Sequence, residues 1–197
     1  MSKHLDLGCG GIPRNPYGRD HIFGTDIRHE DSLNIDLNNV DYHKCNFVID
    51  PLPFPDNYFD SLSAFDVIEH IPRQIFSSNE ELVYPFIHVM NEIYRVLKPN
   101  GLFLATTPGY PSNEAFQDPT HVNFITKSTV LYFSGNNPPG AMYGFNGNFH
   151  IEMNKFCVRN NYLDRSSGYW RNFFRRWHRK LFKNGWPHII WELRAIK

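Results

Sequence analysis

The sequence predicts an α/β fold built on a doubly wound, mostly parallel sheet of about seven strands. Short apolar runs alternate with turns and helical patterns, as parallel strands joined by crossover connections require. The chain has 197 residues, which is enough for one domain with a sizeable core. The first apolar run leads directly into a glycine-rich turn, a common arrangement beside a ligand site in such folds. We therefore expect a single domain over residues 1–197.

Strands are expected where apolar residues cluster between turn signals. Five parallel strands are predicted over residues 4–7, 22–27, 46–50, 61–67 and 102–107. Near the C-terminus, residues 188–196 are predicted as a strand and residues 150–158 as its antiparallel neighbour.

The clearest helix is predicted over residues 85–97. Pro85 suits a first helical turn, and the Lys-Pro-Asn-Gly run at 98–101 is expected to end the helix in a turn. Its apolar residues recur at helical spacing: Phe86, Met90, Ile93 and Leu97.

The first two connections between predicted strands show little of the apolar periodicity that a helix requires. Pro13 and Pro16 leave room for about one helical turn between residues 11 and 22. The pattern between residues 27 and 46 is weak. We expect abbreviated early helices and one poorly covered sheet face, which the C-terminal region or a second copy in a homo-oligomer could cover.

Charge and cysteine content narrow the class of protein. Lys and Arg number 20, as do Asp and Glu, so global charge does not indicate nucleic acid or membrane. Cys9, Cys45 and Cys157 show no metal-ligand spacing, which argues against a disulfide framework and a structural zinc site. We assign no metal ligands. Without a signal region or an apolar run of about 20 residues, a soluble cytoplasmic protein is expected.

The glycine-rich turn is the first candidate binding motif. Gly8 and Gly10 would let the backbone approach a nucleotide-like ligand closely. Asp6 is expected to lie under the turn and accept hydrogen bonds from its amides or from the ammonium of an amino-acid moiety. The alternative is a tight strand-to-loop turn that binds nothing.

Two acids at predicted strand ends extend this site. Asp26 is placed to bind both hydroxyls of a ribose, although a solvated acid at a strand end is common. Asp50 would accept from an adenine amino group, and Leu52 would lie against the adenine face.

The segment that follows resembles a known family. Residues 52–60 (LPFPDNYFD) and 65–71 (FDVIEHI) resemble the "LPFPDNSFD…LEHI" stretch of class I methyltransferases of the ubiquinone-biosynthesis-like, type 11 group. Residues 97–101 (LKPNG) resemble the "LKPGG" turn of that group. The resemblance covers residues 3–125. It implies a Rossmann-like fold with an antiparallel last strand, and S-adenosylmethionine as the methyl donor.

The resemblance also assigns roles to residues. It places Asp50 and Leu52 at adenine, and Asp26, with Ile27 beside it, at ribose. Four residues match the loop around the methionine part: Asp6, Gly8, Cys9 and Gly10. Phe65 and Asp66 match the strand tip beside the sulfonium. This chain departs from the family at Ile12, where a third glycine is usual.

Residues 118–126 are the candidate acceptor motif. They look like the "DPTH…F(F/Y)T" run of a subset of these methyltransferases. His121 would orient or deprotonate an acceptor, since the imidazole pKa is about 6.5. In the alternative, Asp118 and Thr120 cap a following helix and His121 packs there. His70 is the second candidate base, with the same alternative of a structural role.

Residues 159–187 are predicted to contain a basic amphipathic helix, as a lid or surface insertion. Residues 155–183 hold nine basic residues and one acid, Asp164. The part at 170–183 would rest on an anionic membrane surface, hold an anionic substrate or contact nucleic acid. The alternative is a helix whose apolar face covers the domain.

These features predict methyl transfer by direct in-line displacement. We expect a small or amphiphilic acceptor, with an RNA methyltransferase as one alternative. A second alternative is a protein that binds S-adenosylmethionine without catalysis, alone or as a subunit of a larger assembly. A nicotinamide-dependent oxidoreductase is a third, but Pro13 stands where its fingerprint needs glycine.

Overall fold

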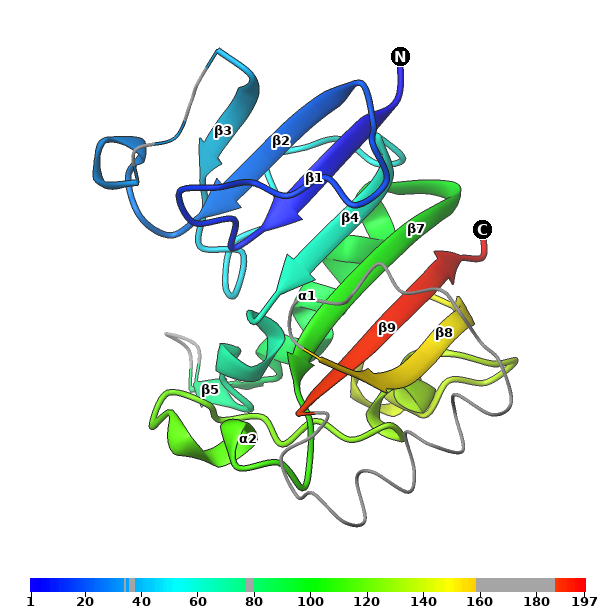
Figure 1. Cartoon of the computed structure of the whole chain (residues 1–197). Helices are drawn as coiled ribbons and strands as arrows, with labels where there is room; N and C mark the ends of the chain where they lie inside the picture. Colours follow the sequence, from blue (N-terminus) through cyan, green and yellow to red (C-terminus); the bar gives the residue numbers. More distant parts are fainter. Residues whose placement is uncertain (34, 36–37, 77–79, 159–186) are drawn as a thin grey trace, which may run out of the picture.

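The structure is a computed structural model that describes residues 1–33, 35, 38–76, 80–158 and 187–197. Seven strands form one sheet in the order β3-β2-β1-β4-β7-β9-β8 (Figure 1). In chain order they are β1 (Lys3–Leu7), β2 (His21–Asp26), β3 (Val40–Lys44), β4 (Phe59–Phe65), β7 (Leu97–Pro108), β8 (Phe149–Cys157) and β9 (His188–Ala195). The first five pair in parallel, whereas β9 is antiparallel to both β7 and β8. The predicted Rossmann-like α/β sheet with an antiparallel last strand is confirmed.

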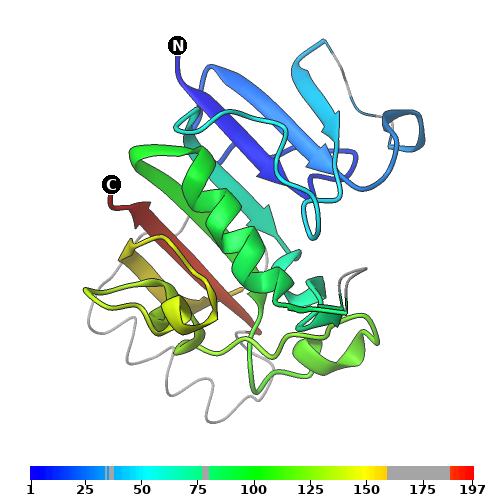
Figure 2. The same cartoon turned by 180° about the vertical axis from the view of Figure 1, so that it is seen from behind.

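The main helix, α1 (Pro85–Val96), lies across one face of the sheet (Figure 2). It starts at Pro85, as predicted, and buries Val89, Met90 and Ile93 in the core. The expected turn at 98–101 belongs instead to the start of β7, where Asn100 has a positive φ of 62°. Pairing between β4 and β7 is irregular there, with a register shift between Phe59 and Ser61.

The remaining elements are short. The other described helix is α2 (Glu114–Gln117), and a small hairpin pairs β5 (Ile75–Phe76) with β6 (Leu82–Val83). Four short 3-10 helices complete the described part of the chain: η1 (Glu30–Ser32), η2 (Ile68–His70), η3 (Thr129–Phe133) and η4 (Pro139–Tyr143). Among the described residues, no helix is both long enough and apolar enough to cross a membrane.

The predicted third strand at 46–50 is wrong. The strand is β3 (Val40–Lys44), and residues 46–50 form a turn in which the amides of Ile49 and Asp50 donate to the Asn46 carbonyl, at 3.0 and 2.9 Å. β3 is an edge strand of half-exposed and exposed residues, so it has no apolar run to reveal it. The apolar run at 47–49 marks a turn that buries Phe47.

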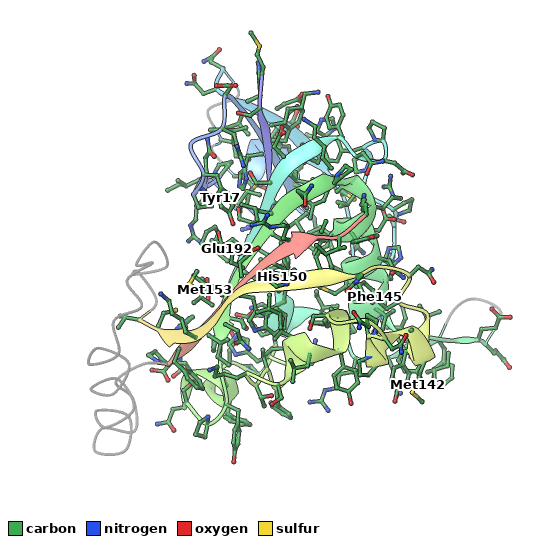
Figure 3. All side chains as sticks on the ribbon, turned by 90° about the vertical axis from the view of Figure 1, so that its right-hand side faces the viewer. Tyr17, Met142, Phe145, His150, Met153 and Glu192 are labelled. Carbon is green, nitrogen blue, oxygen red and sulfur yellow. The ribbon has the colours of Figure 1, made fainter. Side chains whose placement is uncertain are left out.

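A loop connects β1 to β2, without even the single helical turn for which the two prolines were expected to leave room. No helix occurs in residues 8–20, all of which the structure describes. Hydrogen bonds fix the loop to the sheet, because the Arg19 Nε donates to Ser61 Oγ at 3.2 Å and the Tyr17 hydroxyl donates to Glu192 Oε1 at 2.9 Å (Figure 3). The predicted basic helix of 159–187, apart from Pro187, lies outside the described residues.

Candidate functional site

The carboxyl ends of the parallel strands meet at one edge of the sheet. Figure 1 shows the arrowheads of β1, β2, β4 and β7 pointing toward the same end, where α2 and β5 lie. Residues that follow β1, β2 and β4 therefore come together, although the ends of β1 (Leu7) and β4 (Phe65) lie 58 positions apart in the chain. This is the edge at which open α/β sheets bind ligands.

The turn after β1 depends on glycine. Gly8 and Gly10 have positive φ values of 61° and 59°. A Cβ added to Gly8 would lie 2.6 Å from a methyl carbon of Val67, the second residue after the end of β4. The Cys9 amide donates to the Thr25 carbonyl at 3.0 Å and ties the turn to β2. The backbone thus passes closer to its neighbours than a side chain would allow.

Asp6 lies under this turn and supports it. Its carboxylate accepts from the Arg14 amide at 2.8 Å and from the Ser63 hydroxyl at 2.5 Å. Burial raises the pKa of Asp6 to about 7, and these two hydrogen bonds only partly oppose that effect. Accepting from a loop amide is one of the two roles expected for Asp6.

A cavity of about 300 Å³ opens beside the turn, and we call it the glycine-turn cavity. Its walls are mostly apolar, and the carboxylates of Asp26 and Asp66 border it. The lining residues are Gly8, Asp26, Ile27, Arg28, Cys45, Asn46, Phe47, Val48, Asp66, Val67, His70 and Ile71. Apolar walls with an acid at the tip of β2 suit a nucleoside.

Asp26 already carries a full set of hydrogen bonds. Arg28 donates from Nε to Oδ1 and from its terminal nitrogen to Oδ2, both at 3.0 Å, and the Gly10 amide donates to Oδ2 at 3.1 Å. Burial alone would raise the pKa of Asp26, but the hydrogen bonds from Arg28 and Gly10 outweigh it and hold that pKa below its usual value. The Arg28 side chain is 56% exposed, so it can leave when a ribose takes its place. With that exchange, the cavity fits S-adenosylmethionine.

The structure brings only part of the predicted donor site to this cavity. Gly8, Asp26, Ile27 and Asp66 line it. Cys9 and Gly10 lie in the adjoining turn. Phe65 lies elsewhere, buried against Leu104 and Ile190.

Asp50 and Leu52 do not reach the glycine-turn cavity. Leu52 is 3% exposed, and its amide donates to Glu92 Oε2 at 2.7 Å in the core below. Asp50 is exposed, and its carbonyl lies 3.2 Å from His88 Nε2. Their expected place beside adenine rested on the predicted strand at 46–50 and on the family resemblance, and that strand is not present. Residues 45–48, directly after β3, line the glycine-turn cavity instead, and a correct strand boundary would have indicated them.

A second cavity of about 500 Å³ adjoins the first, and we call it the histidine cavity. It is lined by Asp66, Glu69, His70, Pro108, Glu114, Gln117, Asp118, His121, Pro187 and His188. Asp66 and His70 border both cavities. Ligands in the two cavities would therefore meet beside these two residues.

The loop at 118–126 is fixed against η2. The amides of Val122 and Asn123 both donate to the Glu69 carbonyl, at 2.9 and 3.0 Å. His70 and His121 consequently lie edge to face, with ring centroids 4.7 Å apart. Asp118 and Thr120 do not cap a following helix, because residues 121–125 are not helical. The capping part of that alternative is wrong, whereas a packing role for His121 is not contradicted, because its ring packs against His70. The structure places both predicted histidines in the histidine cavity.

Sequence reasoning missed His188. This first residue of β9 is 3% exposed, and its Nε2 lies 3.0 Å from Asp66 Oδ1. Within the described part of the chain, its Nδ1 has no hydrogen-bond partner. No local signal marks His188, since the strand order alone brings the start of β9 near the end of β4.

Comparison with known proteins agrees with this arrangement. A family model described as "Methyltransferase domain" matches residues 5–105. The chain is also 32% identical, over 120 residues, to sterol 24-C-methyltransferase erg6 of Aspergillus fumigatus. That match covers 51% of this chain and 26% of the relative, so the chain spans about a quarter of the relative's length.

Solved structures share the fold. A methyltransferase of Haloferax volcanii, in complex with the Trm112 methyltransferase activator, has a TM-score of 0.62 at 16% identity, covering 100% of this chain and 83% of that one. A SAM-dependent methyltransferase from Archaeoglobus fulgidus has a TM-score of 0.56 at 16% identity, covering 98% and 86%. The glycine turn, the sheet order and the family match lead to one conclusion: the chain belongs to the methyltransferase-domain family of S-adenosylmethionine-dependent, class I methyltransferases.

Proposed function

We propose that the protein transfers a methyl group to a small, neutral or cationic acceptor held in the histidine cavity. The observation that carries this proposal is that the two cavities share Asp66 and His70. A donor in the glycine-turn cavity and an acceptor in the histidine cavity would meet at these residues. In-line displacement needs this kind of alignment and little else.

S-adenosylmethionine, when bound, supplies an electrophilic methyl group on its sulfonium. The chain's own residues hold and orient it. Gly8 keeps the turn close to β4, Asp26 would bind the ribose hydroxyls after Arg28 leaves, and the apolar walls exclude water. Phe47 and Val48 supply the wall expected to face the adenine.

Asp66 is the residue best placed to accept a proton from the acceptor. It borders both cavities, and His188 lies 3.0 Å from one of its oxygens. A neighbouring imidazole orients the carboxylate and stabilises its charge. His121 and His70 orient the acceptor in this proposal.

The charge of the histidine cavity favours acceptors without phosphate. Four carboxylates line it, from Asp66, Glu69, Glu114 and Asp118. Acids that line one cavity repel anions. This argues against RNA, which would bring phosphates toward the cavity, and supports hydroxyl or amine acceptors.

A third cavity supports an acceptor that also has an apolar part. It has a volume of about 770 Å³ and includes Asn123 and Phe124, which follow His121 in the chain. Its other aromatic residues are Tyr84, Phe86, Tyr132, Phe133 and Tyr143. The named substrate of the Aspergillus relative, a sterol, is amphiphilic in the same sense.

The test combines binding with turnover. Calorimetric titration should show S-adenosylhomocysteine binding, and transfer of a labelled methyl group should follow with hydroxylated or amine amphiphiles but not with RNA. Asp66→Asn should lower kcat by about 10²- to 10⁴-fold while S-adenosylhomocysteine still binds. Asn tolerates the positive φ of 56° at this position, so the backbone is kept. Nucleotide binding without turnover on any acceptor would instead support a non-catalytic binding protein.

A further inference from the structure

Three potential metal ligands converge at one side of the histidine cavity. Glu69 and His70 belong to η2, and His121 comes from the loop at 118–126. One ligand atom from each lies within 4.8 Å of the other two. Glu69 is 1% exposed and the His121 side chain is 8% exposed. We infer that Glu69, His70 and His121 form a binding site for a divalent transition-metal ion.

The tautomer of His70 follows from its neighbours. The Thr120 hydroxyl has a single proton, which it donates to Asp118 Oδ1 at 2.7 Å. The same hydroxyl lies 2.9 Å from His70 Nδ1, so it must accept a hydrogen bond from that nitrogen. The proton of neutral His70 is therefore on Nδ1, and Nε2 keeps the lone pair that a metal ion needs. Carboxylates that fix a histidine ligand in this way are common around metal sites.

His121 has an unused nitrogen in a buried position. Its Nε2 faces Asp118 Oδ2 at 3.8 Å. Its Nδ1 is buried and finds no hydrogen-bond partner among the residues that the structure describes. A buried polar atom without a partner is costly, which favours a ligand at that position. Asp118 thus adjoins both imidazoles, one directly and one through Thr120.

The chemistry of the three ligands selects the ion. Two imidazoles with one carboxylate suit Zn²⁺ and other late first-row ions, whereas Mg²⁺ and Ca²⁺ prefer oxygen ligands alone. Bonds in a tetrahedral zinc site place ligand atoms roughly 3.3 Å apart, so small side-chain rotations would draw the trio together. Asp66, Glu114 and Asp118 line the same cavity and add negative charge that favours a cation.

The role of the metal site rests on the proposed function, because the ion would help to hold the methyl acceptor. The existence of the site does not depend on that function. Three protein ligands leave a fourth position, which in catalytic zinc sites is taken by water or substrate. A hydroxyl or amine acceptor could occupy that position and be oriented beside Asp66. His70 and His121 would then orient the acceptor through the ion.

Metal binding can be measured without nucleotide or acceptor. The full chain, free of affinity histidines and stripped with a chelator, is titrated with Zn²⁺ by calorimetry and with Co²⁺ by visible absorption. We expect saturable binding of one ion, d–d bands typical of low coordination number, and no competition from Mg²⁺. His121→Ala should weaken Zn²⁺ binding by at least about tenfold.

Two matched controls sharpen the test. Thr120→Val removes the hydroxyl that fixes His70 and should weaken binding about 10- to 100-fold, whereas Thr120→Ser keeps the hydroxyl and should bind like the wild type. His150→Ala removes an exposed histidine, labelled in Figure 3, near the start of β8. The other end of β8, at Cys157, is the end that pairs with His188 of the histidine cavity. The His150→Ala variant should bind Zn²⁺ unchanged. Thermal unfolding of each variant confirms that it is folded.

The outcomes separate this inference from the proposed function. Absence of stoichiometric Zn²⁺ binding, or equal affinity in the wild type and His121→Ala, would overturn the metal site. S-adenosylhomocysteine is titrated into the same metal-free protein. If Zn²⁺ binds and S-adenosylhomocysteine does not, only the proposed function fails.

Discussion

The carboxylate of Asp26, the residue expected to bind a ribose, already accepts hydrogen bonds from other residues of this chain. Both carboxylate oxygens accept from Arg28, and one also accepts from the Gly10 amide. These bonds keep the buried acid ionised. They also make Arg28 a competitor for the hydroxyls of a ribose, since each oxygen accepts only about two hydrogen bonds.

Substitution of Asp26 should therefore weaken nucleotide binding. Asp26→Ala is expected to reduce the affinity for S-adenosylhomocysteine by roughly 1–3 kcal/mol, because ribose hydroxyls would lose a buried partner. Arg28→Ala should not weaken it. Asp50→Ala is the matched control and should have no effect, since Asp50 lies outside the glycine-turn cavity. Calorimetry measures all three, and unchanged affinity in Asp26→Ala would remove Asp26 from the site.

Asp6 and His4 impose opposite pH dependences on stability. Burial lowers the pKa of His4 to about 4, with a further contribution from Arg19. Below pH 6.5 the unfolded chain binds the His4 proton more readily, so this group makes stability rise with pH between about 4 and 6.5. The pKa of Asp6 is raised to about 7, so the folded chain keeps the Asp6 proton up to a higher pH than the unfolded chain does. Its contribution makes stability fall as pH rises from 3.8 toward 7.

In the wild type, the opposite effects of Asp6 and His4 on the pH dependence of stability partly cancel. Without the Asp6 carboxyl group, the effect of His4 should be seen alone. The free energy of unfolding of Asp6→Asn, relative to the wild type, should increase between pH 4.5 and 6.5, by at most about 1.4 kcal/mol per pH unit. Urea unfolding at several pH values measures this slope. Asp50→Asn, at an exposed site, should leave the slope unchanged. A slope in Asp6→Asn equal to that of the wild type would contradict the raised pKa.

At the scale of elements, the β1–β2 connection provides an internal comparison of two glycines. Gly8 and Gly18 have nearly equal positive φ values, 61° and 60°. A Cβ on Gly8 would meet Val67 at 2.6 Å, whereas a Cβ on Gly18 meets nothing within 4 Å. Alanine at either position costs about 1–2 kcal/mol in backbone strain.

The clash should add to that strain only at Gly8. We expect Gly8→Ala to destabilise the fold more than Gly18→Ala and to reduce S-adenosylhomocysteine binding, because the turn borders the glycine-turn cavity. Gly18→Ala should bind like the wild type. Chemical unfolding and calorimetry compare the pair, and equal effects would show that the close approach to Val67 is not needed.

At the scale of the whole molecule, the basic segment at 170–183 remains a prediction, because it lies outside the described residues. We propose that it contacts anionic membrane surfaces. Co-sedimentation with anionic vesicles should fall with added salt and with Arg175→Glu and Arg176→Glu together. Neutral vesicles are the control. Binding that is insensitive to both salt and charge reversal would rule out an electrostatic role.

The sequence by itself determined the features that depend on neighbouring residues. The glycine turn, α1 and the C-terminal strand pair follow from local spacing, and the family resemblance rests on short contiguous motifs. Edge strand β3 escaped prediction because its half-exposed residues give no apolar period. Because that strand boundary was missed, residues 45–48 were not predicted as lining of the glycine-turn cavity.

Only the tertiary structure decided the contents of the histidine cavity. Asp66 meets His188, and Glu69 meets His121, across 122 and 52 positions of sequence. No local pattern encodes such pairs, because the strand order β4-β7-β9 and the loop fixed on η2 create them. Of the residues predicted for the donor, the sequence thus identified Gly8, Asp26, Ile27 and Asp66, which line the glycine-turn cavity. His70 and His121 were also predicted from the sequence, but their neighbour His188 became visible only when distant strand ends were brought to one edge of the sheet.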